Sequence, residues 1–172
     1  MTDTTVLIRI VDDDDEFAAS QKMLIETLGW EVITYASAPE FLSEDALERP
    51  GCLLLDVRMP AMTGLELQQE LEKRNCQLPI IFLSAHGDIE MAVHTMRHGA
   101  VDFLEKPVEP QRLLARVTKA VALFRIYNLC TLVCTLLDDS SSMENAELYN
   151  ERLSKMASRF LFVHQENGLL RL

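Results

Sequence analysis

The chain has 172 residues, of which 48% are hydrophobic and 25% charged, and this composition indicates one globular domain with an appendage. The formal net charge of −11 argues against DNA binding by this chain, because such binding depends on a basic surface. The first residues lack a signal-peptide pattern and the longest apolar stretch, 126–137, is too short to span a bilayer, so we expect no membrane association.

Short apolar runs alternate with helical patterns from residue 6 to residue 125. The runs are rich in Val, Ile and Leu, which is typical of strands that are buried on both faces. Strands are predicted at 6–11, 31–35, 52–56, 78–84 and 101–105. Helices are predicted at 16–28, from a capping box that begins at Ser37, at 65–74, at 88–97 and at 109–125. One face of the fourth helix is apolar and carries Ile89, Ala92, Val93 and Met96.

This alternation predicts an α/β fold in which helices cover both faces of a parallel sheet. Ligands of such sheets bind beyond the carboxyl ends of the strands, so the residues that follow each strand are the informative ones. They are the acidic run Asp12–Glu16, Asp56, Ser84 and Lys106. We therefore expect several carboxylates, one hydroxyl and one ammonium to meet at one edge of the sheet.

This set of groups suits phosphoryl transfer. Clustered carboxylates repel one another unless a cation joins them, and hard oxygen ligands suit Mg²⁺. Lys106 and Ser84 would donate hydrogen bonds to a phosphoryl group. Asp56, which ends a strand and precedes a loop with Pro and Gly, could act as a nucleophile that forms an acyl phosphate.

Simpler interpretations apply to some of these residues. Asp14, Asp15 and Glu16 are expected to be solvated residues that favour the start of a helix. Phe103, taken alone, reads as a core residue. The spacing of His94 and His98 would allow zinc binding, but no third ligand is evident, so an exposed helix face is the preferred interpretation.

Four motifs together resemble the receiver domain of two-component response regulators. In chain order they are VDDDD, LLLDVRMPAMTG, LSAHGD and GAVDFLEKPV. The match is most similar to receivers of the nitrogen-fixation regulator subfamily, which are joined to LuxR-type DNA-binding domains. The resemblance covers residues 6 to about 125, and residues 1–125 are therefore predicted to form the receiver domain. It implies a flavodoxin-like, doubly wound parallel sheet with strand order 2-1-3-4-5 and five helices. We expect a helical C-terminal extension at 126–172, which the resemblance does not cover.

The resemblance also implies the roles of the residues that bind the phosphoryl group and the metal. Asp56 would be phosphorylated by a sensor histidine kinase, and Lys106 would contact the phosphoryl oxygens. Mg²⁺ would be held by Asp13, by Asp56 and by the backbone carbonyl of Arg58. Asp12 would help through water or by orienting the other ligands.

Further roles implied by the resemblance concern switching and hydrolysis. The hydroxyl of Ser84 would bond to the phosphoryl group, and Phe103 would then turn inward as the switch residue. Arg58 and His86 would tune hydrolysis of the phosphoryl group. The Lys106–Pro107 bond is expected to be cis.

The resemblance implies a signalling module in the cytoplasm rather than an enzyme, with only self-catalysed phosphotransfer and autodephosphorylation. Phosphorylation would change the face formed by the fourth helix, fifth strand and fifth helix, which a partner, an output domain or a second copy would bind. The output would be transcriptional. Free cysteines, with no C-x-x-C pair among the four, are consistent with a reducing compartment.

Two other functions deserve comparison. A Mg²⁺-dependent phosphatase of the haloacid-dehalogenase type would use Asp12 as its nucleophile and Asp14 as its second acid, but it would leave Asp56 without a purpose. A degenerate, phosphorylation-independent binding module is the third possibility. The intact set of Asp13, Asp56 and Lys106 argues against it.

Residues 126–172 carry no pattern of a helix-turn-helix with a basic recognition helix. The segment DDSSSMEN at 138–145 reads as a linker. Beyond it, heptad-like spacing predicts an amphipathic helix that docks on the receiver or pairs with another copy, through Tyr149, Leu153, Met156, Phe160 and Val163. A helical extension of the fifth helix, or part of a larger output region, is the other interpretation.

Overall fold

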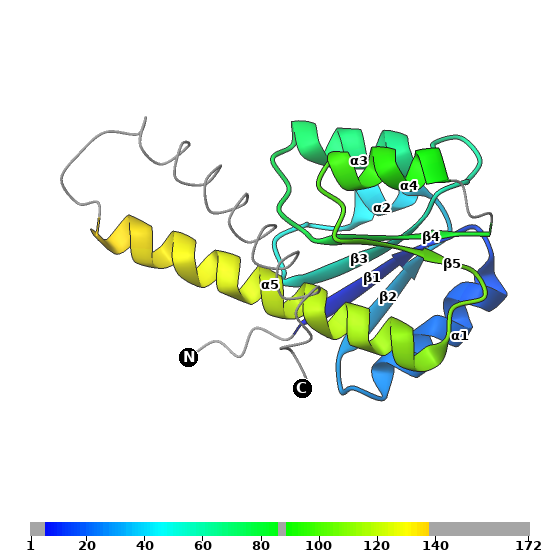
Figure 1. Ribbon diagram of the computed structural model, residues 1–172, viewed down its shortest axis with the longest axis horizontal. Helices are drawn as coiled ribbons and strands as arrows, with labels where there is room; N and C mark the ends of the chain where they lie inside the picture. Colours follow the sequence, from blue (N-terminus) through cyan, green and yellow to red (C-terminus); the bar gives the residue numbers. More distant parts are fainter. Residues whose placement is uncertain (1–5, 86–88, 138–172) are drawn as a thin grey trace. The chain divides into compact units, whose positions relative to one another are not determined.

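Five parallel strands form a single sheet in the order β2-β1-β3-β4-β5 (Figure 1), as predicted. The structure is a computed structural model that describes residues 6–85 and 89–137, with side chains described as far as residue 128. The strands are β1 (Leu7–Val11), β2 (Glu31–Tyr35), β3 (Gly51–Asp56), β4 (Ile80–Ser84) and β5 (Asp102–Glu105). In the register, Asp56 at the end of β3 pairs with Leu83 of β4, and Ser84 pairs with Glu105 of β5.

Helices follow the strands, and three of them begin at side-chain caps. They are α1 (Asp15–Glu26), α2 (Ala38–Glu44), α3 (Gly64–Lys73), α4 (Ile89–Arg97) and α5 (Pro110–Leu137). Asp14 and Ser37 cap α1 and α2. A capping box between Thr63 and Glu66 starts α3. Each cap satisfies backbone N–H groups that would otherwise have no partner in the first helical turn.

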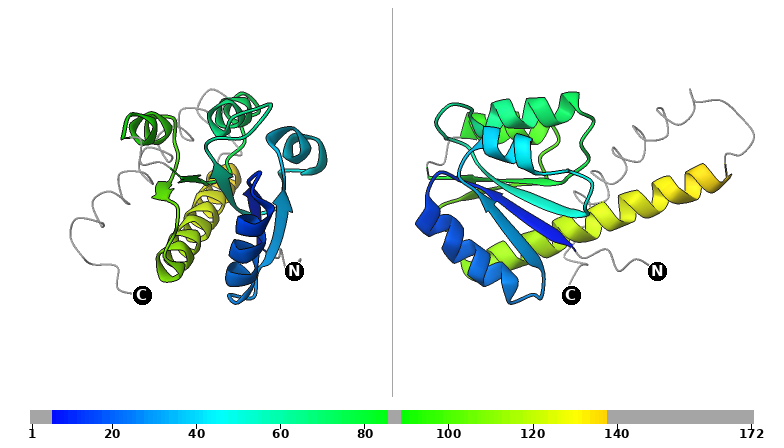
Figure 2. Two further views of the ribbon diagram at one scale, coloured as in Figure 1. Left: turned by 90° about the vertical axis from the view of Figure 1, so that its right-hand side faces the viewer. Right: turned by 180° about the vertical axis from the view of Figure 1, so that it is seen from behind.

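The helices cover both faces of the sheet, with α1 and α5 on one face and α2, α3 and α4 on the other (Figure 2). The first face is closed by an apolar cluster that includes Ile10 of β1, Ile25 of α1 and Val117 of α5. The second is closed by a cluster that includes Phe41 of α2 and Leu67 of α3. Burial of both faces explains why the strands read as continuous apolar runs.

A buried ion pair interrupts the second cluster. The guanidinium of Arg9, in the middle of β1, is only 1% exposed and lies 2.7 Å from the carboxylate of Asp45, which is 3% exposed. The guanidinium also donates to the carbonyl oxygens of Leu7 and Arg49, and Tyr35 donates its hydroxyl to Asp45. The Nε and Nη1 groups of Arg9 therefore donate to acceptors inside the protein, which lowers the cost of burying the charge.

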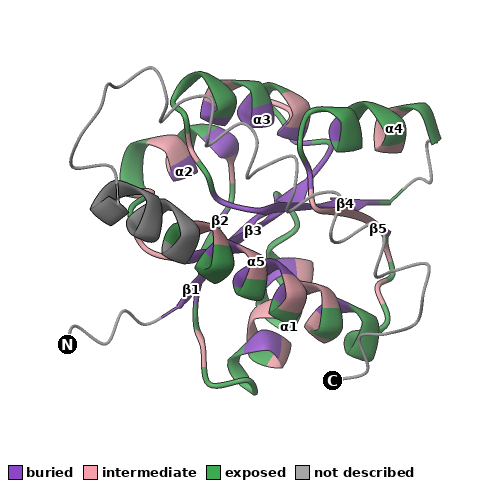
Figure 3. Cartoon of the chain, turned by 60° about the vertical axis from the view of Figure 1, so that its left-hand side comes forward, coloured by how far each residue is buried: buried purple, intermediate pink, exposed green. Residues whose placement is uncertain are grey.

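The apolar face predicted for α4 is largely exposed (Figure 3). The exposed fractions are 79% for Ile89, 44% for Val93 and 45% for Met96. Thr95 is instead the buried residue of this helix, and Gln68 of α3 donates its side-chain amide to the carbonyl oxygen of Thr95. The helix is thus held at its C-terminal end by polar contacts, and its apolar face is free of the core.

Helix α5 continues past residue 125, where the sequence pattern predicted its end. Residues 126–137 contain neither Gly nor Pro, so no local signal stops the helix. The chain divides into two compact units, Met1–Phe124 and Arg125–Leu172. The linker predicted at 138–145 and the heptad-like segment at 149–163 lie outside the described residues. No helix within the described part of the chain is long and apolar enough to cross a membrane.

Candidate functional site

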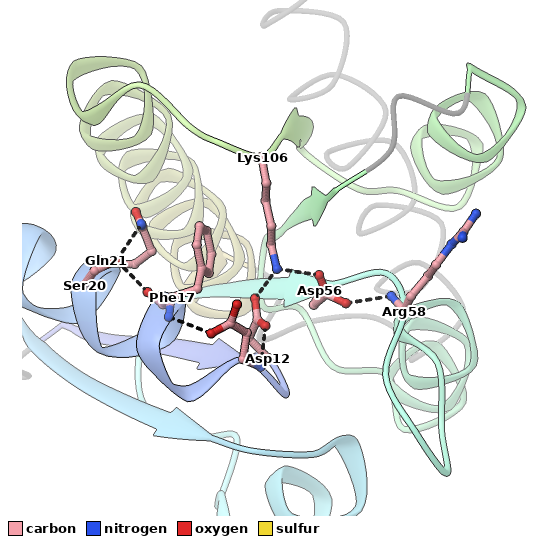
Figure 4. Close-up of polar contacts among 8 residues, drawn as sticks. Asp12, Phe17, Ser20, Gln21, Asp56, Arg58 and Lys106 are labelled. Carbon is pink, nitrogen blue, oxygen red and sulfur yellow. Dashed lines mark hydrogen bonds and ion pairs between the residues drawn. The ribbon is translucent and has the colours of Figure 1, made fainter.

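One ammonium group joins two carboxylates at the carboxyl edge of the sheet (Figure 4). Lys106 Nζ lies 2.6 Å from Asp12 Oδ2 and 2.7 Å from Asp56 Oδ1. The three residues come from the ends of β1, β3 and β5, separated by 94 and 50 positions from Lys106. The convergence predicted from the strand pattern is therefore present for these three side chains.

The site is largely enclosed by protein. The side chains of Asp12, Asp56 and Lys106 are 1%, 8% and 15% exposed. Burial raises the pKa of Asp12 above its ordinary value, and hydrogen bonds from Lys106 and from the Asp14 backbone offset only part of this. Burial alone would lower the pKa of Lys106, but its hydrogen bonds to Asp12 and Asp56 outweigh burial and raise it. Lys106 is thus held in its charged form.

Backbone N–H groups orient both carboxylates. Asp14 N donates to Asp12 Oδ1 at 3.0 Å, and Arg58 N donates to Asp56 Oδ2 at 2.7 Å. Each carboxylate therefore has one oxygen on the backbone and the other on the ammonium. The backbone N–H of Arg58, in the loop after β3, thus orients the Asp56 carboxylate toward Lys106. A fixed orientation is a precondition for Asp56 to act as a nucleophile.

The loop after Asp56 returns to the strand at Gly64. Gly64 N donates to the carbonyl oxygen of Val57 at 3.0 Å, and a Cβ at position 64 would overlap the backbone carbonyl oxygen of Asp56. Only glycine therefore allows α3 to begin this close to the end of β3. The role of this glycine follows from the tertiary structure and is not visible in the loop sequence alone.

We expect Gly64→Ala to lower the free energy of unfolding by about 2 kcal/mol, because the new methyl group must push Asp56 and α3 apart. Urea denaturation would measure the loss. Gly99→Ala is the matched control: Gly99 has a φ of +88° but no atom within 4 Å of an added Cβ, so the alanine would introduce backbone strain without a clash. An equal loss in both variants would contradict the proposed close contact.

Ser84 and the Lys106–Pro107 bond lie on the β4/β5 side of the site. Ser84 is buried at the end of β4, and its carbonyl oxygen accepts from Lys106 N at 2.7 Å. The Lys106–Pro107 bond is cis, as predicted. Phe103 is half-buried on β5 and packs against the cluster under α2 and α3. The switch roles of Ser84 and Phe103 stay predictions.

Two other residues of the predicted site lie at the surface. Asp13 and Arg58 are exposed, whereas their neighbours Asp12 and Val57 are buried. His86 lies outside the described residues. His94 and His98 are exposed on α4 with ring centroids 4.5 Å apart, in agreement with the preferred interpretation of an exposed helix face.

The residues at the site suit Mg²⁺. Within residues 6–85 and 89–128, no three His, Cys, Asp or Glu side chains form a ready metal site. However, Mg²⁺ is commonly bound by one or two carboxylates, with water and phosphate oxygens completing its shell. The buried Asp12 and Asp56 offer two carboxylates, and the adjacent Asp13 is exposed to solvent. Burial raises the pKa of Asp12, and a cation beside its carboxylate would favour the charged form.

One residue of the site was missed by the sequence patterns. The ring of Phe17 lies beside Lys106, with Nζ 4.3 Å from the ring centroid (Figure 4). Its only sequence signal is its position in the first turn of a helix that follows the acidic run.

The position of Asp56 opposite Lys106 weighs against the phosphatase alternative, which gave Asp56 no purpose.

Comparison with known sequences points to one family. Residues 8–118 match the family model of the response regulator receiver domain. Response regulator protein TodT of Pseudomonas putida is 42% identical over 123 residues, which cover 72% of this chain and 54% of TodT. Transcriptional regulatory protein FixJ of Azorhizobium caulinodans is 40% identical over 110 residues, which cover 64% of this chain and 52% of FixJ. The chain thus spans about half the length of these relatives.

Comparison with solved structures agrees with the sequences. The structure of response regulator StyR is similar with a TM-score of 0.74 and 32% identity, over 95% of this chain and 89% of StyR. The structure titled FixJ-N is similar with a TM-score of 0.64 and 36% identity, over 71% of this chain and 96% of that structure. Both likenesses agree with the flavodoxin-like strand order described above.

Proposed function

Because this chain belongs to the response regulator receiver domain family, we propose that Asp56 accepts a phosphoryl group from a sensor histidine kinase and thereby switches the protein between two signalling states. The observation that carries the proposal is the contact of Lys106 with both Asp12 and Asp56 at the carboxyl edge of the sheet. A lone aspartate after a strand is often only a turn residue. The contact of Asp56 with the Lys106 ammonium instead supports a role in phosphoryl transfer.

In the proposed reaction, a carboxylate oxygen of Asp56 attacks the phosphorus of the donor. The new O–P bond forms as the bond from phosphorus to the donor's leaving group breaks, which for a kinase is a P–N bond to histidine. Lys106 stabilises the negative charge on the phosphoryl oxygens. Ser84 donates its hydroxyl to one of these oxygens once the acyl phosphate has formed.

Mg²⁺, held by Asp13, Asp56 and the carbonyl of Arg58, would neutralise charge on the phosphoryl oxygens when bound, and Asp12 would help through water or by orienting the other ligands. The carboxylates supply the negative charge that attracts this ion, and Lys106 limits the repulsion between them. Arg58 and His86 tune the access of hydrolytic water. The protein releases no product other than inorganic phosphate from its own acyl phosphate, so it is a switch rather than an enzyme with an external substrate.

The exposed apolar residues of α4 support a docking role for the face formed by α4, β5 and α5. Ile89, Val93 and Met96 lie in solvent on α4. On the neighbouring elements, Arg116 of α5 lies 3.0 Å from Asp102 of β5. Phosphorylation would change the binding of a second copy or an output domain to this face, through differential contacts in the two states. A C-terminal helix is the alternative site for pairing of two copies.

The regulated output is proposed to be transcription, because relatives such as TdiR of Thauera aromatica are named transcriptional regulatory proteins. The acidic chain described here is not proposed to bind DNA itself. Its action in the cytoplasm, beside a sensor kinase, stays a prediction.

Acetyl phosphate with Mg²⁺ is expected to add one phosphoryl group to the wild-type protein, and peptide mapping by mass spectrometry should place it on Asp56. The variant Asp56→Asn should gain none, and Asp15→Asn, an exposed change at the start of α1, should behave as the wild type. Phosphorylation at any other residue would defeat the proposal. Steady hydrolysis of p-nitrophenyl phosphate that survives Asp56→Ala would favour the phosphatase alternative instead.

A further inference from the structure

The ammonium group of Lys106 has a third neighbour besides the two carboxylates. Its Nζ lies 4.3 Å from the centroid of the Phe17 ring, a distance within the range of a cation–π interaction. Two of its hydrogen bonds go to Asp12 and Asp56. The ring thus lies on another side of the ammonium than the Asp56 carboxylate (Figure 4).

The ring is fixed in place by its own helix and by the core. Phe17 N donates to the capping carboxylate of Asp14 at 3.0 Å, which sets the first turn of α1. Phe17 is half-buried and packs against the apolar cluster between the sheet, α1 and α5. The cap therefore links the acidic run to the position of the aromatic ring beside Lys106.

The face of an aromatic ring constrains the orientation of the ammonium less than a further carboxylate would. The ring attracts the positive charge through its electron-rich face, but it does not require one N–H to point at one atom. Lys106 can therefore redirect one N–H group, which now donates to Asp56, to a phosphoryl oxygen without losing the ring contact. An aliphatic side chain of similar size would cover Lys106 without attracting its charge.

We propose that Phe17 is a positioning residue for phosphoryl transfer, which holds the charged end of Lys106 at Asp56 through the face of its ring. This inference rests on the proposed function of Asp56, and it adds a residue of α1 to the site. The Lys106 ammonium then contacts Asp12, Asp56 and the ring of Phe17.

The first test measures the initial rate at which phosphoramidate phosphorylates the wild type, Phe17→Leu and Phe17→Tyr in the presence of Mg²⁺. We expect Phe17→Leu to react about fivefold more slowly, in line with the strength of a partly buried cation–π contact. Phe17→Tyr keeps an aromatic face and should restore a rate near that of the wild type. An unchanged rate in Phe17→Leu, or an equal loss in Phe17→Tyr, would overturn the inference.

The second test compares urea unfolding midpoints without any phosphoryl donor, so it does not depend on the function of Asp56. Phe17→Leu should lower the midpoint more in the wild-type background than in Lys106→Met, where the cation is absent. Equal shifts in both backgrounds would show that Phe17 acts only as a core residue and would overturn the inference. A wild type that is not phosphorylated at Asp56 would defeat the proposed function. The comparison of Phe17→Leu in the two backgrounds would still test the contact of Phe17 with Lys106.

Discussion

Lys106→Met is expected to lower the free energy of unfolding by about 3 kcal/mol in the absence of divalent cations, because it leaves two buried carboxylates without their shared counter-charge. The side chains of Asp12 and Asp56 are 1% and 8% exposed, so water cannot replace the ammonium efficiently. Mg²⁺ should stabilise the variant more than the wild type, since an ion that binds only the folded state adds its binding free energy to stability. Urea denaturation with and without Mg²⁺ measures both effects.

Lys73→Met provides a matched control for this experiment. Lys73 also pairs with a carboxylate, that of Glu70, but its side chain is 74% exposed. Exposed pairs contribute little, so this variant should unfold close to the wild type, with no added response to Mg²⁺. A stability of Lys106→Met equal to that of the wild type would mean that Lys106 does not compensate the charges of Asp12 and Asp56.

Arg9→Met should cost about 3 kcal/mol of unfolding free energy at pH 7, because the Asp45 carboxylate would remain buried without its cation. Burial by itself raises the pKa of Asp45, but the hydrogen bond and charge of Arg9, with the N–H of Leu47, outweigh burial and lower it. The Arg9–Asp45 pair therefore stabilises the wild type fully above the pKa of Asp45 in the unfolded state, which is about 3.8. This stabilisation is lost as the pH falls through the lower pKa of Asp45 in the folded state.

Acidification should thus narrow the difference in stability between Arg9→Met and the wild type. In the variant, burial of Asp45 is no longer offset, so protonation of this carboxyl relieves the cost, whereas in the wild type protonation breaks the pair. Unfolding curves from pH 7 to about pH 3, which reach below the unfolded pKa of Asp45, would test this. Glu31→Gln is the control, since its pair with Arg49 is exposed and its loss should change little. A difference that widens toward acid pH would contradict the assigned ion pair.

The sheet and the cluster of charged residues at its edge could be predicted because few rules govern them. Apolar runs separated by helical patterns imply a parallel sheet, and the carboxyl ends of its strands then bring Asp12, Asp56 and Lys106 together whatever the details of packing. The strand order came from the resemblance of four motifs to a family. Capping residues such as Ser37 could also be recognised, because a cap depends on neighbouring residues alone.

Features that depend on tertiary contacts could not be predicted. Periodicity shows that Ile89, Val93 and Met96 share a face of α4, but not that this face turns to solvent. Arg9 stands in an apolar strand, and its partner Asp45 lies 36 residues away in a loop. The contact of Phe17 with Lys106 likewise joins two remote segments. Helix α5 ends at Leu137 and not at residue 125. This agrees with the second interpretation of the segment after residue 125, a helical extension of the fifth helix.

Fluorine NMR of the protein with Mg²⁺ and beryllofluoride, a mimic of an aspartyl phosphoryl group, tests most directly whether Asp56 and its neighbours hold a phosphoryl group. We predict bound fluorine resonances for the wild type that require Mg²⁺ and are absent from Asp56→Asn. Bound resonances that persist in Asp56→Asn, or a wild type that shows none with Mg²⁺ present, would contradict the account.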